Sequence, residues 1–190
     1  MSESYITQND LILNRLITFY SKNNFKHIKS ILTIINGESH ISLRLIDWFV
    51  TNYAKKNFTQ FNIRKKNEVK TFKVHKEYKL MLRSYKKRRF DPFCRWERIS
   101  IPYENNTTIQ TTIGQLNFFE WCINNNILEH IKENLDTIER DMNKRNSTAK
   151  KKDGTEKEKS NKTRKKRNEL SVSATKTVKK ENVEIIVKFN

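Results

Sequence analysis

Helical apolar periodicity fills the first 143 residues of this chain and stops at Asn143. Up to that point apolar residues recur every three or four positions, or alternate in short runs, as they do in packed helices and strands. From residue 144 onward the sequence is rich in Lys, Ser, Thr and Asn and almost free of aromatic residues. Such a composition buries too little apolar surface to offset the entropy lost on ordering. We therefore predict one folded domain, residues 1–143, and a disordered Lys/Arg-rich tail, residues 144–190, with a short strand at residues 183–189.

Helix and strand signals within the first 143 residues predict an α+β domain that is predominantly helical, with a small antiparallel β-sheet. Three helices are predicted first: from a Thr7 cap to about Lys22, with Leu11 in its apolar stripe, from about Asn24 to a stop at Gly37, and from a Ser39 cap to about Tyr53. The next predicted elements are a hairpin of residues 58–63 and 69–74, a helix over 76–89 ended by Asp91-Pro92, and an edge strand over 99–103. They are followed by a polar loop over 104–108, a helix capped by Thr112 and broken at residues 124–126, and a helix over 128–142.

The positive charge lies in two blocks. The chain has a net charge of +18, and residues 55–98 hold 16 basic and 4 acidic side chains. Residues 144–190 hold a further 16 basic and 6 acidic side chains. A basic excess this localised indicates a polyanionic partner, most often nucleic acid.

Within the first block, phosphate contacts are expected from side chains that neutralise the backbone and release counterions. The predicted nucleic-acid-binding residues are Arg64, Lys65, Lys66, Lys79, Arg83, Lys86, Lys87, Arg88, Arg89, Arg95 and Arg98. The prediction depends on these cations converging on one exposed face. The aromatic residues between them either stack on unpaired bases or belong to the core, and we favour the core: Tyr78, Tyr85, Phe90, Phe93 and Trp96.

The tail contains a run that matches a monopartite nuclear-localisation pattern. Its residues are Lys162, Arg164, Lys165, Lys166 and Arg167. A generic basic tail that adds nonspecific affinity explains the same run, and the two interpretations are compatible.

Catalytic, metal and cofactor sites are not predicted. Glu68-Val-Lys70 matches the E-x-K of some nucleases but lacks an upstream carboxylate, and Cys94 is expected to be a buried structural cysteine. The helix over 128–142 is acidic, which disfavours insertion into a DNA groove and favours docking on the basic block of the same chain or a second copy. No apolar run resembles a signal peptide or a membrane span, so a soluble, intracellular protein without membrane contact is expected.

Three stretches together carry a family resemblance: SLRLIDWFVTNYAKKN (residues 42–57), YKLMLRSYKKRRFDPFCRWERI (78–99) and TTIGQLNFFEWCINNNILEHI (111–131). They resemble uncharacterised proteins of giant nucleocytoplasmic large DNA viruses of the mimivirus and phycodnavirus kind. The resemblance spans roughly residues 40–142. It implies a viral setting, either the host nucleus or a cytoplasmic viral factory, and it transfers no site.

The expected function is that of a nonenzymatic viral protein associated with nucleic acid, DNA or RNA, through a basic surface and a basic tail. The alternative is a minor virion structural or scaffold protein that contacts other viral proteins, with copies joined through the 128–142 seam or the 183–189 strand. An enzyme with an unrecognised active site is a further alternative.

Overall fold

The computed structural model describes residues 7–22, 25–65, 68–103, 107–152 and 179–182. The elements are α1 (Gln8–Ser21), α2 (Lys26–Asn36), α3 (Leu43–Trp48), the π-helical turn η1 (Phe49–Tyr53), α4 (Ala54–Lys56), β1 (Gln60–Lys65), β2 (Glu68–Lys73), α5 (Val74–Tyr85), the 3-10 turn η2 (Lys87–Arg89), β3 (Arg98–Pro102), β4 (Thr107–Thr112), α6 (Ile113–Asn124), α7 (Ile127–Glu133), α8 (Leu135–Lys152) and β5 (Lys179–Asn182). Helices dominate, and the strands form two small antiparallel sheets, so the predicted α+β class is confirmed.

Local capping chemistry sets the ends of the first helices. The Thr7 backbone N–H donates to Asp10 Oδ2 at 2.9 Å and Thr7 Oγ1 accepts from the Asp10 N–H at 3.2 Å, so the predicted cap is confirmed. The prediction that Leu11 lies in the apolar stripe of α1 is wrong, because Leu11 is 59% exposed, whereas Ile12, Leu16 and Tyr20 are buried. Gly37 ends α2 with a φ of +76°, as predicted.

The third helix begins later than predicted because Ser42, and not Ser39, caps it. Ser42 Oγ accepts a hydrogen bond from the Leu45 N–H at 3.1 Å, whereas Ser39 Oγ accepts from the nearby Ile41 N–H. The helix then widens into η1 before it resumes as α4.

The predicted hairpin is confirmed, with a register from Gln60↔Lys73 to Lys65↔Glu68. The prediction that the following helix runs to residue 89 is wrong, since α5 ends at Tyr85. Lys86 turns the chain there with a φ of +62°, and this turn lets Phe90 enter the core, where it is 1% exposed. Continuing the helix would have carried Phe90 along its axis and away from that core.

The second sheet has the order β3-β4-β5. The predicted edge strand is confirmed to within one residue as β3, but the predicted polar loop over 104–108 is wrong at its end, because β4 begins at Thr107. β5 pairs with β4 from Thr107↔Asn182 to Gln110↔Lys179. It lies just before the predicted strand at 183–189, which falls outside the described residues.

Helix α8 continues past Asn143 to Lys152, so helical structure extends beyond the predicted domain boundary. Residues 153–178, which include the predicted nuclear-localisation residues, and residues 183–190 lie outside the described residues. The predicted helix over 128–142 is in fact two helices, because Asn134 separates α7 from α8 and its Nδ2 donates to the His130 carbonyl at 2.9 Å. Ile131 and Ile138 nevertheless face the core, as the spacing predicted.

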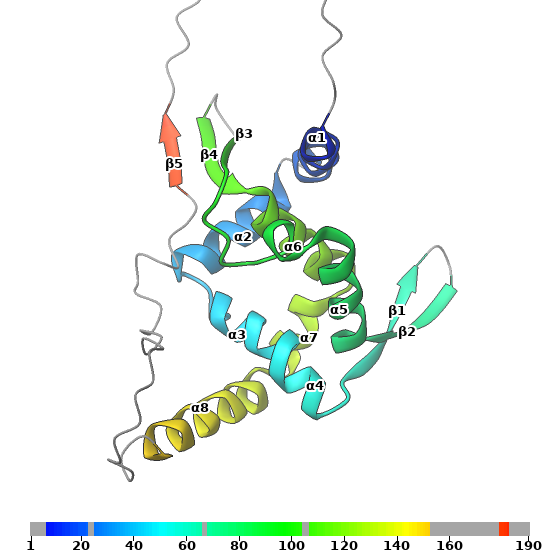
Figure 1. Cartoon of the computed structure of the whole chain (residues 1–190), viewed down its shortest axis with the longest axis vertical. Helices are drawn as coiled ribbons and strands as arrows, with labels where there is room; N and C mark the ends of the chain where they lie inside the picture. Colours follow the sequence, from blue (N-terminus) through cyan, green and yellow to red (C-terminus); the bar gives the residue numbers. More distant parts are fainter. Residues whose placement is uncertain (1–6, 23–24, 66–67, 104–106, 153–178, 183–190) are drawn as a thin grey trace, which may run out of the picture.

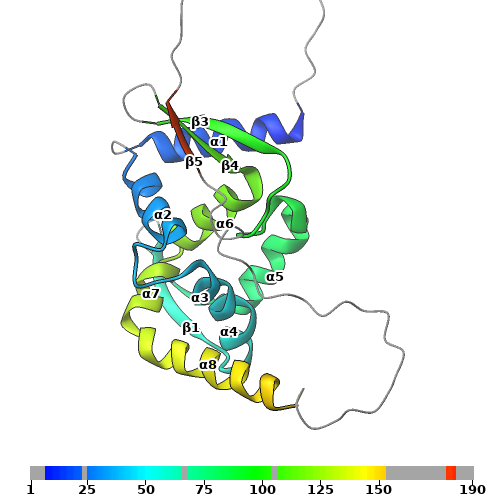
Figure 2. The ribbon, with the colours of Figure 1, turned by 90° about the vertical axis from the view of Figure 1, so that its left-hand side faces the viewer.

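The three-stranded sheet and α1 lie at one end of the molecule and α8 at the other, with α6 between them (Figures 1 and 2). All side chains from Ile113 to Cys122 are buried, so α6 is the central element of the core. Its aromatic residues Phe118 and Trp121 contact Phe90, each with ring centroids 5.6 Å apart. The segment that contains Phe90 is therefore fixed to the middle of the fold.

Candidate nucleic-acid interface

Residues 86–98, which we call the basic loop, join α5 to β3 and hold six basic and two acidic side chains. Both ends of the loop have unusual backbone geometry. Lys86 has φ +62° and ψ 155°, a combination that normally requires glycine, and Glu97 has a φ of +53°. Such conformations cost on the order of 1–3 kcal/mol each and persist only when the surroundings impose them.

The surroundings that impose this path are polar side chains at the start of α6. Three of them donate to successive backbone carbonyls of the loop: Asn117 Nδ2 to Arg89 at 2.9 Å, Gln115 Nε2 to Pro92 at 3.1 Å and Thr112 Oγ1 to Cys94 at 3.5 Å. The Asp91 N–H in turn donates to the Gly114 carbonyl at 3.2 Å. Because the three donors are buried, these bonds exchange little with water and fix the loop on α6.

Gly114 permits the close approach of the loop to α6. A Cβ at this position would lie 2.8 Å from the Arg88 carbonyl oxygen and 3.1 Å from Cys94 Cβ. The first distance is shorter than any ordinary contact and involves backbone, which cannot swing away as a side chain can. The glycine is therefore needed for packing at this point.

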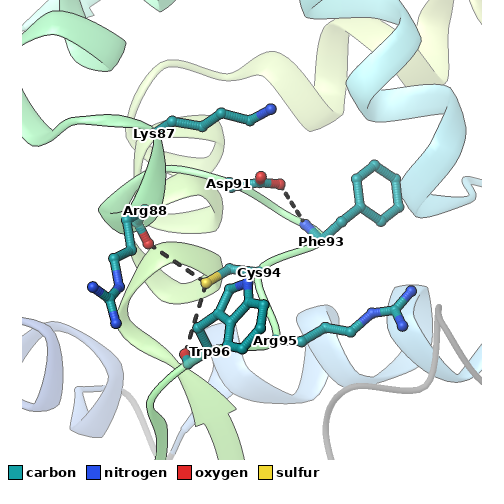
Figure 3. A pocket seen from close by; sticks show the side chains of 7 residues that line it. All are labelled: Lys87, Arg88, Asp91, Phe93, Cys94, Arg95 and Trp96. Atoms are coloured by element: carbon teal, nitrogen blue, oxygen red, sulfur yellow. Dashed lines mark hydrogen bonds between the residues drawn. The ribbon is translucent and has the colours of Figure 1, made fainter. Parts of the chain in front are cut away.

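An open groove of about 800 Å³ lies along the loop. Its lining residues are Lys87, Arg88, Asp91, Phe93, Cys94, Arg95 and Trp96. In the view of Figure 3 the side chains of Arg88 and Arg95 extend on either side of the Trp96 indole. The structure thus brings three of the eleven predicted contact residues to one groove, which an exposed aromatic ring also lines.

The aromatic residues of this region divide between core and surface. Tyr78 and Phe90 are buried, and Tyr85 and Phe93 are half-buried, which agrees with the core interpretation. Trp96 departs from it, because 74% of its surface is exposed. The sequence analysis did not separate Trp96 from the core aromatic residues. The available signal was its position between Arg95 and Glu97, outside any periodic run of apolar residues.

The basic side chains of the loop differ in whether a nearby side chain pairs with them. Arg88 pairs with Glu97 at 2.6 Å, and Arg89 donates to the neutral side chains of Asn9 and Gln8 at 2.7 and 2.6 Å. Across the described residues, no salt bridge is formed by Lys86, Lys87, Arg95 or Arg98. Four exposed positive charges of the loop are thus available to an anionic partner.

One half-buried carboxyl influences the groove from outside the loop. Burial, followed by the charge of Asp91, raises the pKa of Asp47 on α3 to about 6, and the charge of Lys87 opposes this rise. Burial and the same two carboxylates raise the pKa of Tyr78 to about 12. Asp47 was not identified from the sequence, because only the packing of α3 against the loop brings it near Lys87.

The other predicted contact residues that the structure describes do not line the groove. Lys79 and Arg83 are exposed on α5 and Arg64 on β1, while Lys65 Nζ donates to Asn125 Oδ1 at 2.9 Å. Lys66 falls outside the described residues. The assignment of these residues to a nucleic-acid interface stays a prediction.

A second basic groove, of about 300 Å³, was missed by the sequence analysis. It is lined by Phe58, which is 87% exposed, together with Lys55, Lys73 and Lys76. Phe58 was assigned to a strand, but it precedes β1 with a φ of +48°. The pairing of an exposed aromatic ring with several cations is therefore repeated on α4, β2 and α5.

The remaining candidate residues for chemistry, Cys94, Glu68 and Lys70, do not form a site among the described residues. Cys94 is buried, and its Sγ donates to the Arg88 carbonyl at 3.5 Å, as expected of a structural thiol (Figure 3). Glu68 and Lys70 are exposed on β2, and the described residues contain no group of three His, Cys, Asp or Glu side chains that could hold a metal ion. No helix in the described part of the chain is long and apolar enough to span a membrane.

Helix α8 contacts its own chain through Asp141. Asp141 accepts from Trp48 Nε1 at 3.2 Å and pairs with Lys56 at 3.5 Å. Lys56 belongs to the first basic block, so the predicted segment over 128–142 contacts that block at this one pair.

Comparison with known proteins gives a family and no activity. No solved structure matches the chain. The chain is 41% identical over 156 residues to the uncharacterized protein L507 of Acanthamoeba polyphaga mimivirus, which covers 80% of this chain and 60% of that protein. The match confirms the predicted resemblance to giant-virus proteins, and the chain spans well under two thirds of the length of this relative. The family of unknown function DUF7197 matches residues 1–190, and the chain belongs to that family.

Proposed function

We propose that the protein binds the phosphate backbone of nucleic acid through the basic loop, and that it does so without catalysis. The observation that carries the proposal is the way the loop is held. Three buried donors at the junction of β4 and α6 fix its backbone, while Lys86, Lys87 and Arg95 extend from it as exposed cations outside any salt bridge of the described residues.

The physical basis is counterion release. Each lysine or arginine that neutralises a phosphate frees a condensed cation, so affinity falls steeply with salt and depends little on sequence. Lys86, Lys87 and Arg95 have no salt bridge to break among the described residues, and the exposed Arg88–Glu97 pair adds little stability that binding would forfeit. Lys79 and Arg83, four residues apart on α5, extend the same type of surface.

The tail contributes to the same function in this proposal. Its basic run from Lys162 to Arg167 adds nonspecific affinity and, in a host cell, a nuclear address. The sites of action would be the host nucleus or a cytoplasmic viral factory, and the virion if the protein remains on the genome.

The test is a salt titration of the full chain with a triple variant, Lys86→Gln, Lys87→Gln and Arg95→Gln. Binding to a 20-base-pair duplex is measured by fluorescence anisotropy at several salt concentrations. If each cation contacts one phosphate, the plot of log affinity against log salt becomes less steep by about 2–3 units. The matched control replaces three exposed lysines outside the basic blocks with Gln: Lys22, Lys26 and Lys132.

The control removes the same net charge, so it separates a local surface from a general charge effect. An equal change of slope in both triple variants would reject the basic loop as the binding surface. Absence of duplex and single-strand binding by the parent chain would reject the function itself.

A scaffold role is the second candidate, and the β4–β5 pairing favours it. β5 belongs to the C-terminal segment of the chain yet completes the sheet begun by β3 and β4. A strand supplied to β4 by a second copy would use the same hydrogen bonds and would join two molecules. The 128–142 seam is a weaker candidate for this role, because Ile131 and Ile138 are already buried in the core.

A further inference from the structure

We infer that the groove of the basic loop receives an unpaired nucleobase on Trp96, so that the partner is single-stranded nucleic acid. The inference rests on the proposed function and specifies the class of ligand. Its basis is an exposed, positioned indole between cations, which phosphate binding alone does not require.

Trp96 differs from the other two tryptophans of the chain. Trp121 is buried in the aromatic cluster of the core, and Trp48 donates its indole N–H to Asp141. Trp96 is 74% exposed, and its side chain has no hydrogen bond, ring stacking or cation-π contact among the described residues. Core packing therefore does not explain the large apolar ring at this position.

The ring is presented from a fixed backbone. Cys94 Sγ lies 3.8 Å from the Trp96 carbonyl oxygen and 3.5 Å from that of Arg88, so the buried thiol ties both strands of the loop together. Because this backbone is already fixed, it loses little conformational freedom when a base stacks on the ring.

The cations around the ring suit a nucleotide. Arg88 and Arg95 flank the indole in Figure 3, and Lys87 lies at the same groove. A base on Trp96 would leave its phosphates beside these side chains, which is the combination that single-strand binding proteins use. The volume of about 800 Å³ falls within the range of sites that enclose small-molecule ligands.

Duplex nucleic acid does not satisfy this site. Every base in a duplex is already stacked on its neighbours, and only its edges are accessible from the grooves. A stacking residue therefore discriminates for single strands, whereas the cations serve both ligands. This difference separates the present inference from the function on which it rests.

The experiment compares Trp96→Ala with Leu11→Ala, which truncates another exposed apolar side chain on α1. Three ligands are titrated by anisotropy: a 20-nucleotide thymidine oligomer, a 20-base-pair duplex and an abasic phosphodiester of the same length. Trp96→Ala should weaken thymidine-oligomer binding about 5–100-fold with an unchanged salt slope. Duplex and abasic binding should change less than twofold, and Leu11→Ala should behave as the parent chain.

A second variant, Trp96→Phe, retains an aromatic face and should recover most of the affinity. It also removes one indole, so the quenching of tryptophan fluorescence by the oligomer should fall in this variant. Unchanged oligomer affinity in Trp96→Ala would overturn the inference and leave phosphate binding intact. Equal losses on oligomer, duplex and abasic ligand would also overturn it, and binding of no ligand by the parent chain would overturn both proposals.

Discussion

Replacing Gln115 with Leu should destabilise the protein and loosen the basic loop while leaving every charge in place. Gln115 is fully buried on α6 and makes two hydrogen bonds that define the change. Its Nε2 donates to the Pro92 carbonyl of the loop, and its Oε1 accepts from Thr111 Oγ1, both at 3.1 Å. Leucine has nearly the same volume, so the substitution removes polarity with little change in packing.

The magnitude follows from the two groups left behind. The Pro92 carbonyl and the Thr111 hydroxyl each lose a buried partner, at about 1–3 kcal/mol apiece. The gain from burying an apolar side chain in place of an amide offsets about 1–2 kcal/mol of this loss. The midpoints of these two ranges give a decrease of about 2.5 kcal/mol in the free energy of unfolding.

Urea unfolding followed by circular dichroism measures this change. Thr111→Val in the Gln115→Leu background removes the orphaned hydroxyl, so the double variant should be more stable than the sum of the two single changes by about 1 kcal/mol. Gln60→Leu on the exposed face of β1 is the control and should stay within about 0.5 kcal/mol of the parent. A Gln115→Leu effect no larger than that of the control would refute the idea that α6 holds the loop.

Two further outcomes follow from backbone strain and from a perturbed carboxyl. Lys86→Gly should raise the free energy of unfolding by about 1 kcal/mol, because glycine adopts the φ of +62° and ψ of 155° without strain. Its affinity for nucleic acid should fall, because a positive charge is lost. Denaturant unfolding measures the first effect and anisotropy the second, and a destabilised variant would contradict the assigned geometry. Asp47→Asn should become more stable relative to the parent as pH rises from 4 to 7. The pKa of Asp47 is raised from 3.8 to about 6 in the folded state, so this carboxyl keeps its proton on folding below pH 6. Above pH 6 the folded state must hold the charged carboxylate, which lowers the free energy of unfolding of the parent by roughly 3 kcal/mol. A stability difference that does not change with pH would exclude this origin.

Features governed by neighbouring residues were predictable from the sequence. Thr7, Gly37 and Thr112 end or begin helices through contacts within a few positions, and each was predicted correctly. The hairpin of β1 and β2 followed from two alternating runs around a polar turn. These elements need no information from distant parts of the chain.

Features governed by tertiary contacts were not predictable from the sequence. β4 is a threonine-rich segment that resembles a polar loop, and its strand geometry depends on pairing with both β3 and β5. The end of α5 at Tyr85 depends on the place of Phe90 against Phe118 and Trp121, which are distant in sequence. No local signal distinguishes Tyr85 from Arg89 as the last helical residue.

The candidate site was predictable as a set of residues but not as an arrangement. The basic run over 86–89 and the Arg95–Arg98 segment were evident from the sequence. The sequence did not show that some of these side chains line the groove while Arg89 points toward α1. Lys87 and Arg88 line the groove, whereas Arg89 reaches Asn9 and Gln8. The 3-10 turn over these residues directs neighbouring side chains about 120° apart, so a continuous run of charge does not make a continuous surface.

The polar residues of α6 are the strongest physical argument that this loop has a role beyond linking α5 to β3. A central helix buried on all sides is most stable when it is apolar, because each buried polar group must find a partner or cost free energy. Here Thr112, Gln115 and Asn117 find those partners in the carbonyls of a loop that is itself unfavourable, with strained ends and repelling cations. A neutral connection would need neither the strain nor the buried donors. Binding of a polyanion, as we propose, would offset the cost of holding these charges in one place, and the proposed nucleic-acid ligand would also use the exposed ring of Trp96.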